Sequence, residues 1–322
     1  MNLLNQIFKI NSDKEFEKLA LKAFDFQMKN NDIYRLFSDK ILKKKYPAQL
    51  SDIPFLPIEF FKDKKIFTNH HKVDKIFVSS GTSLSRSKHL VADLNIYEES
   101  FLNGFLNFYG DPKDYCFLAL LPNYLEQKNS SLVYMINKFI EISSYKESGF
   151  VLNDFDLLAK TLKSLEKKSN KIILFGVTYS LIDFAKKHPM NLKSTTIIET
   201  GGMKGRRKEL VKEEVYQILS NSFNTDNIHS EYGMTELLSQ AYSKKINEFQ
   251  SPSWMKIMIR DVNDPLTITE DGSGAINIID LANLYSCPFI ATEDLGRINK
   301  NNTFGILGRM DYSESRGCNL MI

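Results

Sequence analysis

The spacing of apolar residues predicts helices in the N-terminal part of the chain. Ser12 and Glu15 form a capping box, and apolar side chains follow it at intervals of three and four residues. A second helical pattern covers residues 33–46. Residues 53–61 hold two prolines among apolar side chains, so we expect an extended, packed crossing there and no helix interior.

Beyond residue 80 the pattern alternates between short apolar runs and longer helical periods. Such alternation is typical of βαβ units, in which helices connect parallel strands. From about residue 256 the apolar runs shorten and turns crowd in, which predicts a β-rich subdomain. The expected fold class is α/β with a mostly parallel sheet. The predicted strands cover residues 75–78, 115–121, 171–175, 195–199 and 227–230, and the predicted helices cover residues 94–109, 132–142, 154–167, 180–187 and 205–219.

Composition and charge favour a globular protein over nucleic-acid-binding, membrane-spanning or disulfide-rich classes. With 322 residues, 43% of them hydrophobic and 25% charged, the chain can bury a large core and is typical of a soluble globular protein. The net charge of +3 is too small to indicate a nucleic-acid partner. No run reaches the roughly 18 apolar residues of a transmembrane segment, and no signal peptide is recognisable. Three cysteines at long spacing predict no disulfide framework, so a reducing, cytoplasmic location is expected.

A loop of small hydroxylated residues follows the first predicted strand. Ser79, Ser80, Gly81 and Thr82 come directly after residues 75–78, and Lys88 closes the loop. Unpaired backbone amides, hydroxyl groups and a lysine are suited to phosphate oxygens, and glycine lets the backbone approach closely. The spacing is not that of a Walker A motif. Taken alone, the loop is equally compatible with an ordinary solvated turn.

Similar turns recur after the other predicted strands. Small, hydroxylated or glycine-containing segments follow Phe175, Glu199 and His229 as well as Val78. In open α/β sheets, ligands bind outside the carboxyl ends of the parallel strands, where these turns should gather. The sequence therefore predicts a nucleotide site at this edge, although each turn by itself is also a normal connection.

Four side chains further along have the chemistry that such a site needs. Tyr232 offers a flat face for a purine, Thr235 a hydroxyl for a phosphate, and Glu236 a hard oxygen ligand for Mg²⁺. Asp294, in a segment predicted to follow a strand, is suited to the two hydroxyls of a ribose. The alternative interpretation makes Tyr232 a core residue, Glu236 the first residue of a helix, and the segment of Asp294 an ordinary turn.

Taken together, these motifs resemble the adenylate-forming superfamily of acyl- and aryl-CoA ligases, luciferases and peptide-synthetase adenylation domains. The resemblance extends from Ser79 to Asp311 and includes four ordered motifs. Within the superfamily the chain looks most like the acyl-protein synthetases, the fatty-acid-activating component of bacterial bioluminescence reductase complexes, and their phenylacetate-CoA ligase relatives. The motifs are Ser-Ser-Gly-Thr through Lys88, Tyr-Gly-Met-Thr-Glu from Tyr232, Thr-Glu-Asp-Leu-Gly-Arg from Thr292, and Gly-Arg-Met-Asp from Gly308.

The resemblance implies a role for each matching position. The serine loop and Lys88 would hold the phosphates of ATP, and Thr235 would contact the α-phosphate. Glu236 would bind Mg²⁺. Gly201, Gly202 and Tyr232 would flank the adenine, and Asp294 and Arg309 would hold the ribose. Gly233 would also belong to the cofactor-binding residues.

Three departures from the superfamily pattern also matter. The loop has Ser83-Leu84 where Thr-Gly is favoured, with no proline before Lys88, and Glu293 stands where glycine is usual. Only 11 residues follow Asp311, so the mobile C-terminal domain with the adenylation lysine is expected to be absent. The expected organisation is a large adenylate-forming domain over residues 1–311, with its β-rich subdomain from about residue 250, and a short tail over residues 312–322.

The tail carries a candidate nucleophile. Cys318 lies in a polar, glycine-containing segment, and the nearby Arg316 would favour the reactive thiolate. Cys116 lies in an apolar strand and is expected in the core, and Cys287 precedes a proline and is expected to be structural. The alternative is that Cys318 is an unreactive thiol.

The expected function is ATP- and Mg²⁺-dependent activation of a fatty acid as acyl-AMP, followed by transfer to Cys318 and then to a partner protein or carrier. One alternative is a minimal CoA ligase or carrier-protein acyltransferase that is never itself acylated. A second alternative is a degenerate, non-catalytic binding subunit of an acyl-transfer complex. The sequence determines neither the chain length of the acid nor the identity of the acceptor.

Overall fold

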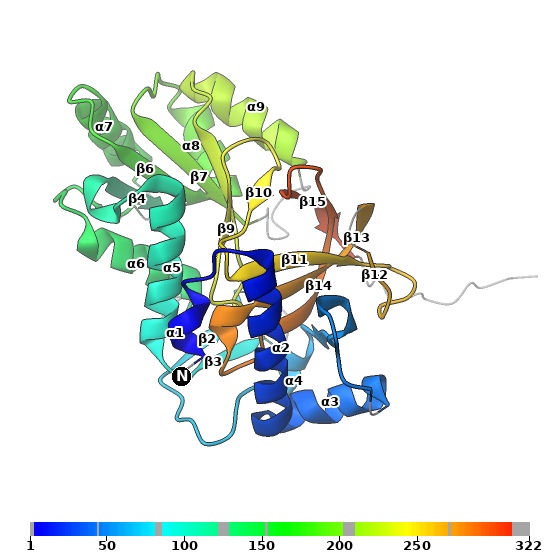
Figure 1. Ribbon diagram of the computed structural model, residues 1–322. Coiled ribbons are helices and arrows are strands. Elements are labelled where there is room, and N and C mark those ends of the chain that lie inside the picture. The colour runs from blue at the N-terminus through cyan, green and yellow to red at the C-terminus, as the bar shows by residue number, and fades with distance from the viewer. Residues whose placement is uncertain are drawn as a thin grey trace, which may run out of the picture.

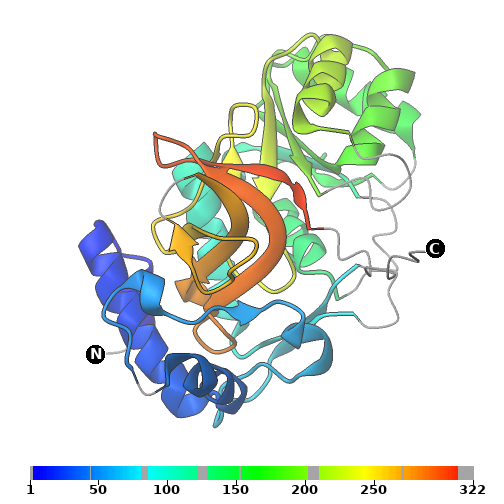
Figure 2. The same ribbon diagram turned by 90° about the vertical axis from the view of Figure 1, so that its right-hand side faces the viewer.

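The computed structural model consists of two connected halves (Figure 1). It describes residues 3–43, 45–80, 86–121, 129–151, 154–201, 210–269 and 272–310. The middle of the chain, coloured green, forms an α/β half, and the segments coloured yellow to red form a half made mostly of strands. The N-terminal helices, in blue, lie beside the strand-rich half in both views (Figure 2).

Local capping explains where the N-terminal helices begin. The Ser12 side chain accepts a hydrogen bond from the Glu15 amide, and Asn31 caps the next helix by accepting from the Tyr34 amide. The N-cap predicted at Ser12 is therefore confirmed, but the box is not closed as predicted, because the Glu15 side chain accepts from the Asn11 amide at 3.1 Å and not from that of Ser12. The second helix ends at Leu42, earlier than predicted, because Lys43 adopts a left-handed conformation. These helices are α1 (Leu4–Ile7), α2 (Asp13–Asn30) and α3 (Asp32–Leu42), followed by η1 (Leu50–Asp52), β1 (Leu56–Pro57) and α4 (Phe60–Asp63).

The middle of the chain forms the parallel part of the main sheet, in the order β5, β4, β6, β7, β8. Strands β4, β6, β7 and β8 agree closely with the prediction, whereas β5 was not predicted. The last helix begins later than predicted and ends at Phe223. The strands are β4 (Cys116–Leu120), β5 (Gly149–Phe150), β6 (Ile172–Val177), β7 (Thr195–Thr200) and β8 (Ile228–Tyr232), and the helices are α5 (Leu94–Tyr109), η2 (Pro112–Asp114), α6 (Ser131–Ile142), α7 (Phe155–Glu166), α8 (Thr178–Lys187) and α9 (Lys212–Phe223).

Both faces of this parallel part are covered by helices. In β4, Cys116, Leu118 and Leu120 join the cluster that includes residues of α7, α8 and α9. The alternate residues Phe117 and Ala119 join the cluster that includes residues of α5 and α6. This two-residue alternation, apolar on both faces, explains why the strand sequences are continuous hydrophobic runs.

The second half extends the same sheet with antiparallel strands. Among the described residues, thirteen strands form one sheet, in which β8 continues through β9, β10, β15, β14, β13 and β11 to β12. Strands β9 and β10 already belong to this part, before residue 256 where the sequence predicted its beginning. Strand β1 adds to β14 in parallel. The elements are β9 (Ala241–Ser243), β10 (Phe249–Gln250), β11 (Met255–Arg260), β12 (Ile268–Thr269), β13 (Gly272–Asp280), η4 (Leu281–Asn283), β14 (Phe289–Ile298) and β15 (Phe304–Arg309).

The strand before the serine loop is not part of the parallel sheet, contrary to our expectation. β2 (Lys75–Val78) pairs antiparallel with β3 (Lys88–Val91) in a separate two-stranded sheet. A short strand with three apolar residues does not specify its partner, and here the residues just beyond the loop supply that partner. The serine loop therefore connects two strands of a hairpin.

Candidate active site

Two hydrogen bonds between Ser79 and Ser87, called here the serine-loop frame, connect the two ends of the serine loop (residues 79–87). The Ser79 amide donates to the Ser87 carbonyl at 3.1 Å, and the Ser87 amide donates to Oγ of Ser79 at 3.1 Å. Lys88 lies opposite Val78 in the hairpin and is exposed. Of the predicted loop residues, Ser79 and Ser80 are described, whereas Gly81 and Thr82 lie outside the described residues. The hairpin thus brings Lys88 to the base of the loop.

His89 connects this hairpin to the Tyr-Gly-Met-Thr-Glu block. Its Nδ1 lies 2.7 Å from the carbonyl oxygen of Thr235, and its Nε2 lies 2.9 Å from Oδ1 of Asn283. The side chain is fully buried, and this burial lowers the pKa of His89 to about 4, so the imidazole is neutral at pH 7. Asn283 in turn donates from Nδ2 to the Glu236 carbonyl at 2.8 Å. Two side chains therefore hold the backbone of Thr235 and Glu236 next to the hairpin.

Glu236 is a buried carboxylate in a turn. Its side chain is 5% exposed, and burial raises its pKa, while a hydrogen bond with Ser87 and the charges of Arg309 and Lys62 lower it. The alternative in which Glu236 begins a helix is wrong, because the described residues after it form a turn and then β9. Glu236 is thus close to both the serine-loop frame and a cation of β15.

Tyr232 and Asp294 come together from the two halves of the molecule. Tyr232 ends β8, and its hydroxyl donates to Oδ2 of Asp294 at 2.8 Å. Arg309 of β15 lies opposite Asp294 in the sheet, and its Nε donates to Oδ1 at 3.2 Å. Asp294 lies within β14 and not after a strand as we expected, because β14 continues as far as Ile298. The sequence-predicted ribose residues are therefore neighbours in the fold.

The ring of Tyr232 is largely buried. It is 9% exposed and makes edge contacts with Phe249 and Phe304, with ring centroids 6.0 and 5.6 Å away. Its position on the strand, and not in the following loop, agrees with the alternative in which Tyr232 packs in the core. Stacking of a purine on Tyr232 stays a prediction.

Gly233 fits its position because Glu231 lies beside it. A Cβ atom at residue 233 would be 2.4 Å from Oε1 of Glu231, which is closer than any ordinary contact. Glu231 is buried, accepts a hydrogen bond from the Thr200 hydroxyl, and burial raises its pKa to about 7. The glycine of the motif thus makes room for a buried carboxyl group.

A polar network that the sequence analysis did not assign lies at the ends of β6 and β7. Glu199 is buried and accepts from Lys212 Nζ at 2.6 Å and from Ser230 Oγ at 3.2 Å. Thr178 also donates to Glu199 and lies 2.9 Å from the carbonyl of Gly201. Gly201 has a φ of 74°, which a residue with a side chain rarely adopts. Gly202 lies outside the described residues.

The sequence allowed only part of this network to be predicted. Thr178 and Glu199 stand at strand ends, where ligand-binding residues gather, and this position was recognisable. Lys212, at the start of a helix, shares no spacing pattern with Glu199, so the ion pair was not predictable.

The two described cysteines are unsuited to nucleophilic catalysis. Cys116 and Cys287 are fully buried free thiols, as predicted. Burial raises the pKa of Cys116 to about 11 and that of Cys287 to about 12, so neither forms an appreciable amount of thiolate at pH 7. Cys318 lies outside the described residues.

The described part of the chain contains no helix with the length and apolarity needed to span a membrane. Within those same residues, no group of three or more His, Cys, Asp or Glu side chains is placed to hold a metal ion.

The comparison with known proteins identifies the family. The family model described as acyl-protein synthetase, LuxE, matches residues 7–322. The chain belongs to this family. The long-chain-fatty-acid–luciferin-component ligase of Vibrio harveyi is 24% identical to this chain in an alignment 329 residues long, which covers 94% of this chain and 86% of the relative. The resemblance inferred from the motifs is therefore confirmed, and the protein is a ligase.

Solved structures with a similar fold are adenylate-forming enzymes. An open conformation of 2-hydroxyisobutyryl-CoA ligase with 2-HIB-AMP and CoA matches 96% of this acyl-protein synthetase and 78% of its own chain, at 12% identity and a TM-score of 0.59. ATP-bound MatB from Rhodopseudomonas palustris matches 77% of this chain at 14% identity and a TM-score of 0.52. The match covers 49% of MatB, so this chain spans about half its length. The predicted α/β, adenylate-forming fold is confirmed. Its main sheet is mixed and not mostly parallel as expected, because the strand-rich half continues it with antiparallel strands.

Proposed function

We propose that this protein uses ATP to activate a long-chain fatty acid as acyl-AMP, transfers the acyl group to Cys318, and delivers it to a thiol of a partner protein. The family supports an acyl-protein synthetase, and the Vibrio harveyi relative is named for a long-chain fatty acid. A fold like that of ATP-bound MatB supports the use of ATP.

One structural observation carries the proposal. The Tyr232 hydroxyl and the Arg309 guanidinium both bind Asp294, while His89 links the strand of Lys88 to the carbonyl of Thr235. Residues separated by more than two hundred positions are thus brought together by the fold. Candidate ribose-binding groups on β14 and β15, with candidate phosphate-binding groups beside the hairpin, support a nucleotide site.

The first step joins the acid to AMP. A carboxylate oxygen of the fatty acid attacks the α-phosphorus of ATP, the new O–P bond forms, and the bond to the β-phosphate oxygen breaks to release pyrophosphate. Lys88 and the hydroxyl of Thr235 stabilise the negative charge that develops on the phosphates. Asp294 has lone pairs left for ribose hydroxyls, because a carboxylate accepts about four hydrogen bonds and two are used here.

Glu236 fits a role in holding Mg²⁺. Mg²⁺ in ATP-dependent enzymes is usually bound by one or two carboxylates together with substrate phosphates and water, so a single buried glutamate is enough. Without a cation, burial raises the pKa of Glu236, which indicates a carboxylate whose charge a neighbouring cation would stabilise. When bound, the ion supplies positive charge to the phosphates of ATP.

The second step moves the acyl group to the protein. The thiolate of Cys318 attacks the acyl carbonyl carbon, a C–S bond forms, and the bond to the phosphate oxygen breaks to release AMP. The raised pKa values of Cys116 and Cys287 disfavour either as the nucleophile. A partner thiolate then attacks the same carbon and releases Cys318.

Two measurements on one variant test the proposal. Cys318→Ser should retain carboxylate-dependent exchange of pyrophosphate into ATP and lose the hydroxylamine-sensitive, protein-bound acyl group formed with labelled tetradecanoic acid. Cys116→Ala is the matched control, because it removes a buried thiol and should leave both signals unchanged. Undiminished hydroxylamine-sensitive labelling of Cys318→Ser would refute the role of the tail cysteine. Absence of pyrophosphate exchange in the unmodified protein, with any fatty acid, would refute the adenylation step.

A further inference from the structure

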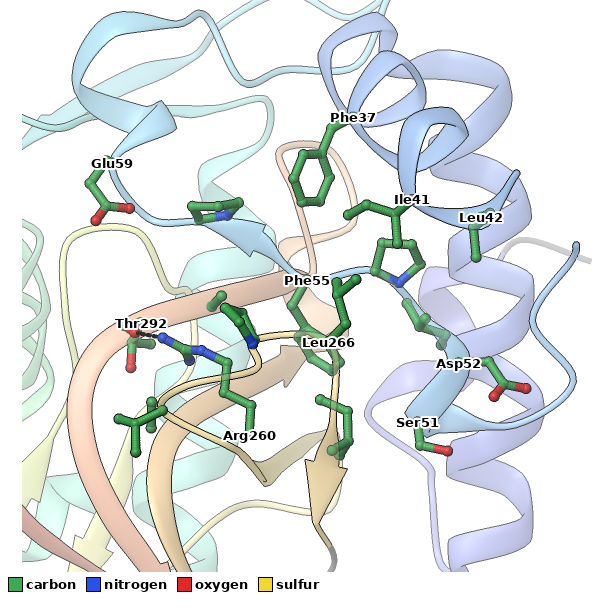
Figure 3. Close-up of a pocket in the computed structure, with 18 of the residues that line it drawn as sticks. Phe37, Ile41, Leu42, Ser51, Asp52, Phe55, Glu59, Arg260, Leu266 and Thr292 are labelled. Atoms are coloured by element: carbon green, nitrogen blue, oxygen red, sulfur yellow. Dashed lines mark hydrogen bonds between the residues drawn. The ribbon is translucent and has the colours of Figure 1, made fainter. Parts of the chain in front are cut away.

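A cavity lies between the N-terminal segment and the strand-rich half (Figure 3). It is distinct from the nucleotide-binding cluster, the name used here for the proposed site residues Lys88, Tyr232, Thr235, Asp294 and Arg309. Its volume is about 560 Å³, within the range of small-molecule sites. Helix α3 and the segment after it form one wall, and β11, β12, β13 and β14 form the other. Most of the lining is apolar. Its large apolar side chains include Phe37, Ile41, Leu42, Phe55, Leu266 and Ile268.

Part of this apolar lining faces water. Leu266 is 63% exposed, Val262 is 52% exposed and Tyr46 is 65% exposed, and all three line the cavity. Single exposed apolar residues are normal on a protein surface, but several around one hollow indicate a ligand-binding surface.

The charged groups in the wall carry both signs. Arg260 donates to the carbonyl oxygens of Ile276 and Thr292 and to Oδ1 of Asn277, so its guanidinium is already engaged by the sheet. Lys45, Asp52 and Glu59 also line the cavity, so two basic and two acidic side chains balance each other. The lining therefore favours neither sign of charge, and its apolar surface fits an alkyl chain.

The cavity adjoins both the nucleotide-binding cluster and the tail. Met310 lines it and donates from its amide to the carbonyl of Glu293 at 2.8 Å, next to Asp294. Met310 is also the last described residue. Cys318 follows eight positions later in the sequence, within about 29 Å of chain when fully extended. A group attached to Cys318 is thus within reach of the cavity.

We infer that the cavity holds the alkyl chain of the acyl group while that group is attached to Cys318 as a thioester. This inference rests on the proposed function and names a site for its acyl-enzyme intermediate. A thioester has lost the negative charge of the carboxylate, so it needs no counter-ion from a wall in which acidic and basic side chains balance. A long alkyl chain in water is strongly driven to an apolar surface, in proportion to the area it exposes. Burial of the chain would also protect the thioester from hydrolysis.

The test compares the lifetimes of two acyl-enzymes in the full chain. The protein is acylated with ATP, Mg²⁺ and labelled tetradecanoic or butanoic acid, excess acid is removed, and loss of the hydroxylamine-sensitive label is followed. Leu266→Asp places a charge in the cavity wall at an exposed position, where folding should be unaffected. It should shorten the tetradecanoyl half-life about tenfold, the effect of exposing about two methylene groups, and leave the butanoyl half-life unchanged.

A matched control and two outcomes complete the test. Leu36→Asp alters another exposed leucine, 58% exposed, that does not line the cavity, and it should change neither half-life. Equal tetradecanoyl half-lives in Leu266→Asp and the unmodified protein would overturn the cavity assignment alone. Failure of the unmodified protein to form any thiol-linked acyl group would overturn the proposed transfer to Cys318 and this inference together.

Discussion

Replacing Glu231 by glutamine should make folding stability less dependent on pH. Glu231 is 5% exposed and lies between the Thr200 hydroxyl, which donates to it, and Gly233. Its pKa is raised from the ordinary value of 4.5 to about 7, mainly by burial and also by the negative charge of Glu199, against the lowering effects of the Thr200 hydrogen bond and the Lys212 charge. Glutamine keeps the shape and the oxygen that accepts from Thr200, and it removes only the ionisation.

The size of the effect follows from proton linkage. Because the folded-state pKa is above the unfolded-state value, the stability contributed by the protonated carboxyl is fully present below pH 4.5 and is lost as the pH rises through 7. Between pH 5 and pH 8 this loss amounts to about 2.5 kcal/mol of unfolding free energy for a single group with these two pKa values. Glu231→Gln has no such loss at residue 231.

The assay is urea-induced unfolding at pH 5, 6, 7 and 8. The free energy of unfolding of the unmodified protein is subtracted from that of Glu231→Gln at each pH, so that contributions from other titrating groups cancel. The difference should change by about 2.5 kcal/mol in favour of the variant between the lowest and highest pH. Glu213→Gln, on the exposed face of α9, is the control and should give a constant difference. A constant difference for Glu231→Gln as well would refute the reasoning.

Two further predictions concern the backbone of the Tyr-Gly-Met-Thr-Glu block. Gly233→Ala should sharply reduce pyrophosphate exchange, because the added Cβ would collide with the side chain of Glu231. Gly104→Ala is the control and should leave exchange unchanged, because a Cβ at residue 104 would have no atom within 4 Å. Equal exchange in both variants would contradict the steric argument. His89→Ala should raise the KM for ATP about tenfold by freeing the Thr235 carbonyl, and His89→Gln, which retains a donor, should recover part of the loss in the same exchange assay. An unchanged KM in folded His89→Ala would exclude a positioning role for His89.

Local patterns in the sequence were sufficient to predict most helices and strands, but not to predict which strands pair with each other. The cap at Ser12 and the apolar runs of β4, β6 and β7 depend on neighbouring residues, so they were predictable. The pairing of β2 with β3 depends on contacts across the serine loop, and a run of three apolar residues does not encode them. In the same way, the length of β14 is set by its ladders with β13 and β15, which place Asp294 inside a strand.

The candidate site was predictable where its residues belong to compact motifs. Tyr232, Asp294 and Arg309 were named from their motifs, and the fold places them within hydrogen-bond distance of one another through Asp294. His89 was missed because a lone histidine in an apolar strand is usually a core residue. Its contacts with Thr235 and Asn283 join residues that are far apart along the chain, and no spacing rule connects them.

The Tyr232–Asp294 hydrogen bond joins the two halves of the sheet next to the place where their strand pairing is narrowest. Strand β10 is only two residues long, and its link to β15 is the single pair of Phe249 and Phe304. Tyr232 belongs to β8 on one side of this seam, and Asp294 belongs to β14 on the other side. A molecule that binds both side chains would hold the two parts of the sheet together across this single pair. Binding of that molecule would then make the whole sheet stiffer, and its release would make the sheet more flexible.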